Sequence, residues 1–205
     1  MIHYNCENDD FDLFDRQLTR IETEFGDFLA KLTWVSLGGG IHFTGDGYPI
    51  ARLAARLKAF AERFGVQVYL EPGEAAITQC ASLEVSVLDL LDNGKKLAIV
   101  DSSVEAHMLD LLIYRENAKM HVAGDHDYMI CGKSCLAGDV FGEFSFPAPL
   151  AIGDRLSIAD AAGYSMVKKN WFNGVRMPSI VLREVDGSLT VAREFGYADF
   201  KGNLG

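Results

Sequence analysis

Residues 33–40, TWVSLGGG, place a short apolar segment directly before three glycines, and this run decides how the first part of the chain is interpreted. Before it, large apolar residues recur every three or four positions over 9–32, which predicts an amphipathic helix. After it, residues 50–64 repeat this spacing, and residues 66–70 (VQVYL) predict another buried strand. The alternation of strand and helix indicates a parallel α/β architecture.

Three predicted strand ends carry residues suited to a ligand site. His3 lies in the opening segment, Gly38 follows the second strand and Glu71 follows the third. The intervals between them match the length of a βαβ unit, which is about 30 residues or more. Because ligand sites of parallel α/β barrels gather at the carboxyl ends of the strands, we expect the three residues to share one mouth. The spacing predicts about three β/α units of a (β/α)8 barrel, with roughly five further units outside this chain.

Strand signals replace the helical spacing in the rest of the chain. Residues 83–91 and 97–100 flank Asn93-Gly94, which predicts a hairpin whose tight turn takes positive φ angles at this pair. Residues 180–185 and 189–193 predict a second hairpin, and shorter apolar runs lie between the two hairpins at 128–131, 140–146 and 155–159. This pattern predicts a small antiparallel β-barrel or sandwich.

We therefore expect an α/β part followed by an all-β part. Residues 1–76 are interpreted as part of the (β/α)8 barrel, and residues 77–205 as the antiparallel β domain. The chain shows no internal repeat beyond the β/α unit and no low-complexity tract.

The charge balance disfavours some classes of partner. The 19 Lys and Arg residues against 29 Asp and Glu residues give a net charge of −10, which disfavours nucleic acid and attracts cationic ligands. No apolar run approaches the roughly 20 residues that span a bilayer, and residues 1–10 lack the features of a signal peptide. We expect a cytoplasmic protein that binds neither membranes nor nucleic acid, with its four cysteines reduced.

The glycine triplet suits a phosphate site but is a weak signal alone. Backbone without side chains can wrap a phosphate and offer N–H donors near a helix start, whereas a flexible connector would use the same residues. A dinucleotide-binding motif is disfavoured, because Phe43 stands where the third glycine would lie if Gly38 and Gly40 were the first two.

Cys131 and Cys135 raise the question of a metal site. They form Cys-x-x-x-Cys, and His107, His121 and His126 lie upstream. Structural zinc sites usually show a second closely spaced ligand pair, which is missing here, so we predict no metal. The glycine-rich, polar surroundings of Cys135 instead favour an exposed, reactive thiol.

Five segments extend the signal beyond the glycine triplet. They are IHYNCEN (2–8), EPGEA (71–75), DSSVEAHMLD (101–110), CLAGDVFGEF (135–144) and ADAAGYSMVKKNWFNG (159–174). Together they resemble the fold-type III pyridoxal-phosphate decarboxylases, the ornithine decarboxylase and alanine racemase-like group. The resemblance covers nearly the whole chain, and it is strongest to the branch that acts on carboxylated polyamines.

The resemblance implies pyridoxal 5′-phosphate as the cofactor and decarboxylation as the reaction. A histidine would stack on the cofactor ring, a glutamate would keep the ring nitrogen protonated, and glycines and a tyrosine would hold the phosphate. These cofactor-binding residues would be His3, Gly38, Gly39, Gly40, Glu71 and Tyr164. Cys135 would act as the catalytic general acid, and would enter the site from the partner subunit of a homodimer.

Two departures from ornithine decarboxylase indicate the substrate class. Glu74 stands where that enzyme has arginine, and Arg115 stands where it has aspartate. Carboxylates would pair with the ammonium groups of carboxynorspermidine or carboxyspermidine, which would be converted to norspermidine or spermidine. Arg115 would hold the substrate carboxylate or be a surface charge. The predicted substrate-binding residues are Glu74, Asp110, Arg115, Asp139 and Phe172, with Glu143 as a further candidate.

The lysine that binds the cofactor covalently in this family has no match among the lysines of this chain. In the family that lysine lies on the first barrel strand, upstream of the histidine segment. We therefore expect the 205-residue chain alone to have negligible decarboxylase activity. Two alternatives stay open: a decarboxylase of the diaminopimelate or ornithine type, which the Glu74 exchange disfavours, and a non-catalytic binding protein.

Overall fold

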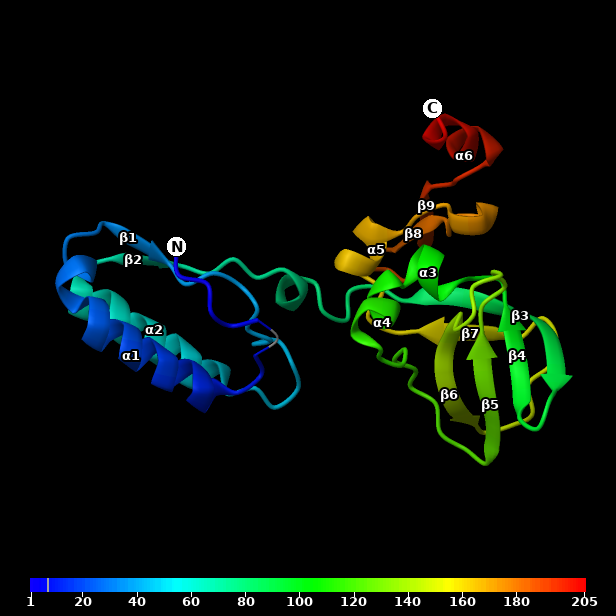
Figure 1. The fold of residues 1–205 in the computed structure, drawn as a ribbon, viewed down its shortest axis with the longest axis horizontal. Coiled ribbons are helices and arrows are strands. Elements are labelled where there is room, and N and C mark those ends of the chain that lie inside the picture. The colour runs from blue at the N-terminus through cyan, green and yellow to red at the C-terminus, as the bar shows by residue number, and fades with distance from the viewer. Residues whose placement is uncertain (7) are drawn as a thin grey trace. The chain divides into compact units, whose positions relative to one another are not determined.

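The computed structural model describes residues 1–6 and 8–205, so Glu7 of the IHYNCEN segment lies outside the described residues. The chain divides into two compact units, Met1–Thr78 (unit 1) and Gln79–Gly205 (unit 2). Long helices dominate unit 1, drawn in blue to cyan, and strands dominate unit 2, drawn in green to red (Figure 1).

Unit 1 combines two helices with a two-stranded parallel sheet. The helices α1 (Phe11–Leu29) and α2 (Ile50–Phe64) follow the two predicted apolar stripes. The strands β1 (Trp34–Ser36) and β2 (Gln67–Tyr69) pair in parallel, and the 3-10 helix η1 (Glu74–Ala76) follows them. Both helices run along the same side of the strands (Figure 1). The predicted helices and the parallel strand pair are confirmed.

The opening segment differs from its prediction as a strand. The described residues 1–5 form no strand, although Ile2 N donates to Ser36 O at 2.8 Å. Asn8 and Ile41 form an isolated parallel bridge. Single hydrogen bonds of this kind do not make a ladder. The segment therefore contacts β1 without adding a third strand to the sheet.

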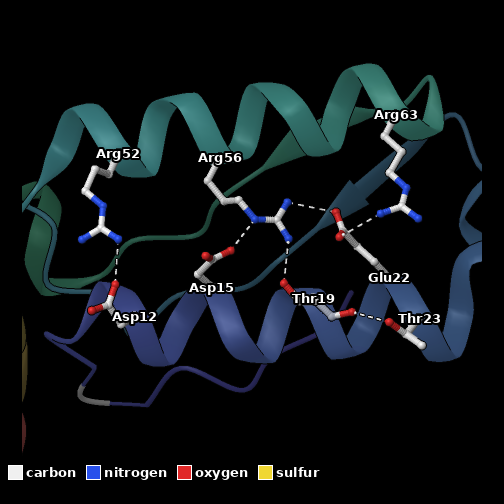
Figure 2. A network of polar contacts seen from close by, with 8 residues as sticks. All are labelled: Asp12, Asp15, Thr19, Glu22, Thr23, Arg52, Arg56 and Arg63. Atoms are coloured by element: carbon white, nitrogen blue, oxygen red, sulfur yellow. Dashed lines mark hydrogen bonds and ion pairs between the residues drawn. The ribbon is translucent and has the colours of Figure 1, made fainter.

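A polar network joins α1 to α2 (Figure 2). Glu22 is only 7% exposed, and its carboxylate accepts from Arg56 Nη1 at 2.9 Å and from Arg63 Nη1 at 3.2 Å. Arg56 Nε also donates to Asp15 at 2.5 Å. Burial lowers the pKa of Arg56, but the hydrogen bonds to Glu22 and Asp15 outweigh it and raise that pKa above its usual value. The network therefore keeps a buried carboxylate paired.

The apolar surface of unit 1 is covered unevenly. Phe14 and Leu18 of α1 are fully buried. On the same helix Phe25 is 49% exposed and Phe28 is 60% exposed, and Trp34 of β1 is 55% exposed. These three residues help to line an apolar pocket of about 530 Å³. Unit 1 therefore presents apolar surface near the end of α1.

Unit 2 is built on a five-stranded sheet with the order β6-β5-β4-β3-β7. Its strands are β3 (Leu83–Asp92), β4 (Lys96–Val100), β5 (His126–Cys131), β6 (Val140–Phe146) and β7 (Arg155–Ile158). β4 and β5 pair in parallel, whereas the other neighbours are antiparallel, so the predicted antiparallel domain is corrected to a mixed sheet. The reason is a crossover between β4 and β5 that contains α3 (Val104–His107) and α4 (Leu109–Tyr114).

A short connecting segment bridges the two edges of this sheet. Ala118 N donates to Phe141 O on β6 at 2.7 Å, and Ala159 N, just after β7, donates to Lys119 O at 2.7 Å. The sheet is therefore curled. It surrounds a core whose members are almost completely buried, among them Val85, Val87, Val100, Ile130, Phe141 and Ile158.

The two predicted hairpins form, with one difference in the first turn. Asp92 pairs with Lys96, and only Gly94 of the Asn-Gly pair has a positive φ, at 74°. The loop is thus three residues long with glycine in the left-handed position, rather than a two-residue turn. The second hairpin is a separate antiparallel ribbon of β8 (Ile180–Arg183) and β9 (Leu189–Arg193).

Short helices complete unit 2. They are α5 (Tyr164–Lys168), the 3-10 helix η2 (Phe172–Gly174) and α6 (Tyr197–Asn203). Within residues 1–6 and 8–205, no helix has the length and hydropathy that crossing a membrane requires.

Candidate functional site

Only glycine fits the loop that follows β1. Gly38 and Gly40 have φ angles of 73° and 84°, in the left-handed region. A Cβ atom on Gly39 would lie 2.3 Å from the carbonyl oxygen of Glu71, and one on Gly40 would lie 1.9 Å from that of Asn5. The opening segment and the Glu71 segment therefore pack directly on the glycine backbone.

His3 and Glu71 lie on this loop. Gly39 N donates to His3 Nδ1 at 3.3 Å, and Glu71 N donates to Gly38 O at 2.8 Å. The structure thus brings together the three positions that the sequence spacing predicted as strand ends, although His3 does not lie in a strand. We refer to His3, the three glycines and Glu71 as the glycine cluster.

Ser36 joins the glycine cluster, and the sequence reasoning missed it. Ser36 is 3% exposed, and its hydroxyl accepts from Gly38 N at 3.2 Å and donates to Glu71 Oε1. One hydroxyl therefore connects the glycine loop to the glutamate. The available signal was a serine in an otherwise apolar strand, two residues before the triplet.

Glu74 begins η1 and is half-buried. Its carbonyl oxygen accepts from Ile77 N at 2.9 Å and from Thr78 Oγ1 at 3.0 Å. Thr44 Oγ1 donates to the carbonyl oxygen of the next residue, Ala75, at 2.8 Å. These contacts fix the backbone that carries Glu74 three residues beyond Glu71.

Cys135 lies in unit 2, in a loop between β5 and β6 that we call the cysteine loop (132–139). Gly132 N donates to Asp139 O at 2.8 Å and closes the base of the loop. Cys135 itself is exposed, and Asn173 Nδ2 donates to its Sγ at 3.1 Å. The sequence analysis included Asn173 as part of the ADAAGYSMVKKNWFNG segment and assigned it no role of its own.

Asp139 fills the base of the cysteine loop. It is 5% exposed, and its Oδ1 accepts from Val104 N at 2.7 Å. Its Oδ2 accepts from Ser134 N at 3.0 Å and from Ser134 Oγ at 2.5 Å. A Cβ on Gly132 would lie 2.3 Å from both carboxylate oxygens, so glycine is required beside them. This placement indicates a role in the loop and does not favour the predicted contact with substrate.

Asp110 and Tyr164 meet at a lysine that the sequence reasoning did not identify. Lys168 Nζ lies 2.5 Å from Asp110 Oδ1 and 4.7 Å from the centre of the Tyr164 ring. The hydrogen bond from Lys168 to Asp110 raises the pKa of Lys168. The Asp110 carboxylate is therefore paired within unit 2.

Arg115 and Phe172 lie at exposed ends of helices. Arg115 follows α4 with a left-handed φ of 57°. Phe172 begins η2 and is 37% exposed, next to the residue that contacts Cys135. Phe172 therefore belongs to the same part of unit 2 as the cysteine loop, whereas the glycine cluster belongs to unit 1.

No group of three or more His, Cys, Asp or Glu side chains is placed to hold a metal ion in the described part of the chain. Cys131 is half-buried, and burial together with the charge of Asp139 raises its pKa. His107 is 5% exposed, with Nδ1 2.8 Å from Ser102 Oγ, and burial lowers its pKa to about 4. Both groups are therefore uncharged at neutral pH.

Known proteins have sequences similar to that of this chain. Residues 75–162 match the family described as pyridoxal-dependent decarboxylase, C-terminal sheet domain. A carboxynorspermidine/carboxyspermidine decarboxylase of Herminiimonas arsenicoxydans is 60% identical, over 100% of this chain and 56% of that protein. A carboxyaminopropylagmatine decarboxylase of Synechocystis sp. is 38% identical, over 99% of this chain and 54% of that protein. The chain thus spans about half the length of the curated relatives it matches.

Solved structures share the fold. The crystal structure of carboxynorspermidine decarboxylase complexed with norspermidine, from Campylobacter jejuni, has a TM-score of 0.91 at 36% identity, covering 98% of this chain and 59% of that chain. A diaminopimelate decarboxylase from M. jannaschii in co-complex with L-lysine has a TM-score of 0.79 at 22% identity, covering 98% of this chain and 50% of that chain. The predicted resemblance to the branch acting on carboxylated polyamines is confirmed.

Proposed function

This chain belongs to the pyridoxal-dependent decarboxylases, and we propose that it contributes to a site where carboxynorspermidine or carboxyspermidine loses carbon dioxide to give norspermidine or spermidine. The glycine cluster carries the proposal. It combines a backbone loop without side chains, an imidazole and a carboxylate at one place in unit 1.

The glycine cluster fits pyridoxal 5′-phosphate. Gly39 and Gly40 are half-buried and carry no side chain, so we propose that the exposed part of this loop presents its backbone to a phosphate. We propose that His3 would stack on the planar cofactor ring and that Glu71 would hold a proton on the ring nitrogen. When bound, the cofactor supplies an electron sink for the carbanion left by decarboxylation. Ser36 keeps the Glu71 carboxylate in a fixed orientation through its hydroxyl.

Cys135 is the proposed general acid. It is exposed at the tip of an ordered loop, and a thiol there could give its proton to the carbon that has lost carbon dioxide. We place Cys135 in the site of the partner subunit of a homodimer, and Tyr164 beside the cofactor phosphate. We further propose that residues 1–76 form part of a (β/α)8 barrel and that residues 77–205 form a β-barrel or sandwich domain.

Acidic residues suit the proposed substrate. The net charge of −10 attracts a polyamine, and Glu74 and Asp110 are the carboxylates proposed to pair with its ammonium groups. A substrate ammonium would replace Lys168 Nζ beside Asp110, since that contact is between half-buried side chains and can exchange. Arg115 would hold the substrate carboxylate, and Phe172 would contact its carbon chain.

The test uses a joined enzyme, in which this chain replaces the matching part of the Herminiimonas arsenicoxydans relative and the rest of that protein is kept. Carbon dioxide release is measured from carboxynorspermidine, carboxyspermidine, carboxyaminopropylagmatine, diaminopimelate and ornithine. We expect fastest turnover with the first two. The proposal would be overturned by an enzyme that binds the cofactor but prefers diaminopimelate or ornithine, or that releases no carbon dioxide from any of the five compounds.

Variants of the same enzyme test the glycine cluster. Glu71→Gln keeps the shape of the side chain but removes its charge, so we expect kcat to fall by about 100-fold while the cofactor still binds. Glu62→Gln is the matched control, because Glu62 is an exposed residue of α2. Equal rates for the two variants would remove Glu71 from the mechanism.

A further inference from the structure

We propose that Asn173 is a positioning residue for Cys135: its side-chain amide holds the thiol at the tip of the cysteine loop, while Asp139 fixes the base of that loop. This inference rests on the proposed function for its meaning, because Cys135 is there the general acid. The contacts that carry it lie entirely within unit 2.

The contact between Asn173 and Cys135 has a defined direction. Asn173 Nδ2 lies 3.1 Å from Cys135 Sγ, and the amide nitrogen can only donate, so sulfur is the acceptor. A thiolate accepts a hydrogen bond more strongly than a thiol does. The contact therefore sets the direction of the Cys135 sulfur.

The backbone around Asn173 aims its amide. Asn173 has φ 57° and ψ 14°, a left-handed conformation that asparagine adopts more readily than most residues. The turn is held by Phe172 N donating to Asn170 Oδ1 at 2.7 Å and by Gly174 N donating to Trp171 O at 2.9 Å. The side chain therefore projects from a fixed backbone and not from a loose tail.

The cysteine loop is held on both sides of Cys135. Ser134 binds Asp139 through its backbone N–H and its hydroxyl, and Leu136 N donates to Ser134 Oγ at 3.3 Å. Lys133 N donates to Ser102 O at 2.9 Å. Asp139 is buried beneath these residues and accepts three hydrogen bonds. Its buried carboxylate therefore fixes the backbone of the loop that carries the exposed Cys135 thiol.

Cys131, just before the cysteine loop, provides an internal reference for the reactivity of Cys135. Cys131 Sγ donates to Met129 O at 3.8 Å, and burial raises its pKa. It should therefore react slowly with an alkylating reagent, whereas exposed Cys135 should react readily. A change at Asn173 should alter the alkylation rate of Cys135 and leave that of Cys131 unchanged.

The experiment measures alkylation of the 205-residue chain by iodoacetamide as a function of pH, with peptide mass spectrometry to separate Cys135 from the other cysteines. Asn173→Gly tolerates the left-handed backbone but lacks the donor, and we expect Cys135 to react about threefold more slowly at neutral pH. Asn173→Asp replaces the donor by a carboxylate, and we expect a loss of about tenfold and a pH profile displaced to higher pH. The control is Asn93→Asp, which adds the same charge in the exposed β3–β4 turn.

The proposal is overturned if the Cys135 profiles of both Asn173 variants superimpose on those of the wild type and of Asn93→Asp. If Asn173→Asp does not fold, as judged by circular dichroism, Asn173→Gly decides alone. Failure of the proposed function is a separate result. It would appear as an unchanged rate and product ratio in the Cys135→Ala form of the joined enzyme, with the alkylation profiles still displaced.

Discussion

Units 1 and 2 differ in how much of their apolar surface they cover themselves. In unit 2 a five-stranded curled sheet surrounds its core, and Phe141 and Ile130 are completely buried. In unit 1 two strands support two helices, so Phe14 is buried while Phe28 and Trp34 stay more than half exposed. An amphipathic stripe therefore predicts a helix, but it does not predict how much of the apolar face is buried. That depends on the width of the sheet that packs against the helix.

Separation of the two units should give the largest effect. We expect residues 79–205 to unfold cooperatively in urea, because their sheet and core lie within that unit. We expect residues 1–78 to bind a hydrophobic dye and to unfold without a sharp transition, since their exposed aromatic side chains have no cover. Circular dichroism and dye fluorescence check this. A sharp, dye-free transition of residues 1–78 would contradict the comparison.

A core phenylalanine in unit 2 should matter far more than an exposed one in unit 1. Phe141→Ala creates a cavity in the closed core, and we expect a loss of about 3–5 kcal/mol in the free energy of unfolding. Phe28→Ala is the control and should change it by about 0.5 kcal/mol or less. Urea denaturation of the 205-residue chain measures both. Similar losses for the two variants would show that Phe28 is covered in solution.

Acid should weaken unit 2 through His107. Its pKa in the folded protein is about 4, below the ordinary value of 6.5, so between these values the unfolded chain binds more protons. Stability should therefore be complete above pH 6.5 and fall as the pH decreases towards 4, by at most about 3 kcal/mol. Urea midpoints measured across this range check the slope. In His107→Asn this part of the slope should disappear, and an unchanged slope would assign it to other groups.

The polar network of unit 1 should give the smallest of these effects. Glu22→Gln leaves Arg56 its contact with Asp15, so we expect a loss of about 1–2 kcal/mol in the free energy of unfolding. Asp12→Asn is the matched control on the same helix, because its pair with Arg52 is exposed and should contribute about 0.5 kcal/mol or less. Thermal and urea unfolding of both variants test the order. A larger loss for Asp12→Asn would contradict it.

The sequence predicted what depends on local spacing. The two helices of unit 1 follow from apolar residues three and four positions apart, and both hairpins follow from glycine turns between apolar runs. The parallel pairing of β4 with β5 was not predicted, because it depends on a crossover whose two short helices carry no strong periodic signal. The opening segment was predicted as a strand from the interval between His3 and Gly38. Such an interval cannot reveal whether the segment finds a strand to pair with.

The candidate site shows the same division. His3, Gly38 and Glu71 could be found because each follows a predicted strand at a regular interval. Ser36 and the contact of Asn173 with Cys135 could not, because each depends on a residue more than 30 positions away. Such contacts exist only after the chain has folded, so residue type and spacing do not announce them.

Edge strands are places where a second chain can add itself and begin an aggregate. In unit 2 the segment at residues 118–119 already occupies part of both edges, through its hydrogen bonds to Phe141 and Ala159. A neighbouring chain would have to displace this segment before it could extend the sheet there. The ribbon of β8 and β9 carries exposed Val181 and Leu189, so strand addition between molecules should begin at that ribbon and spare the curled sheet.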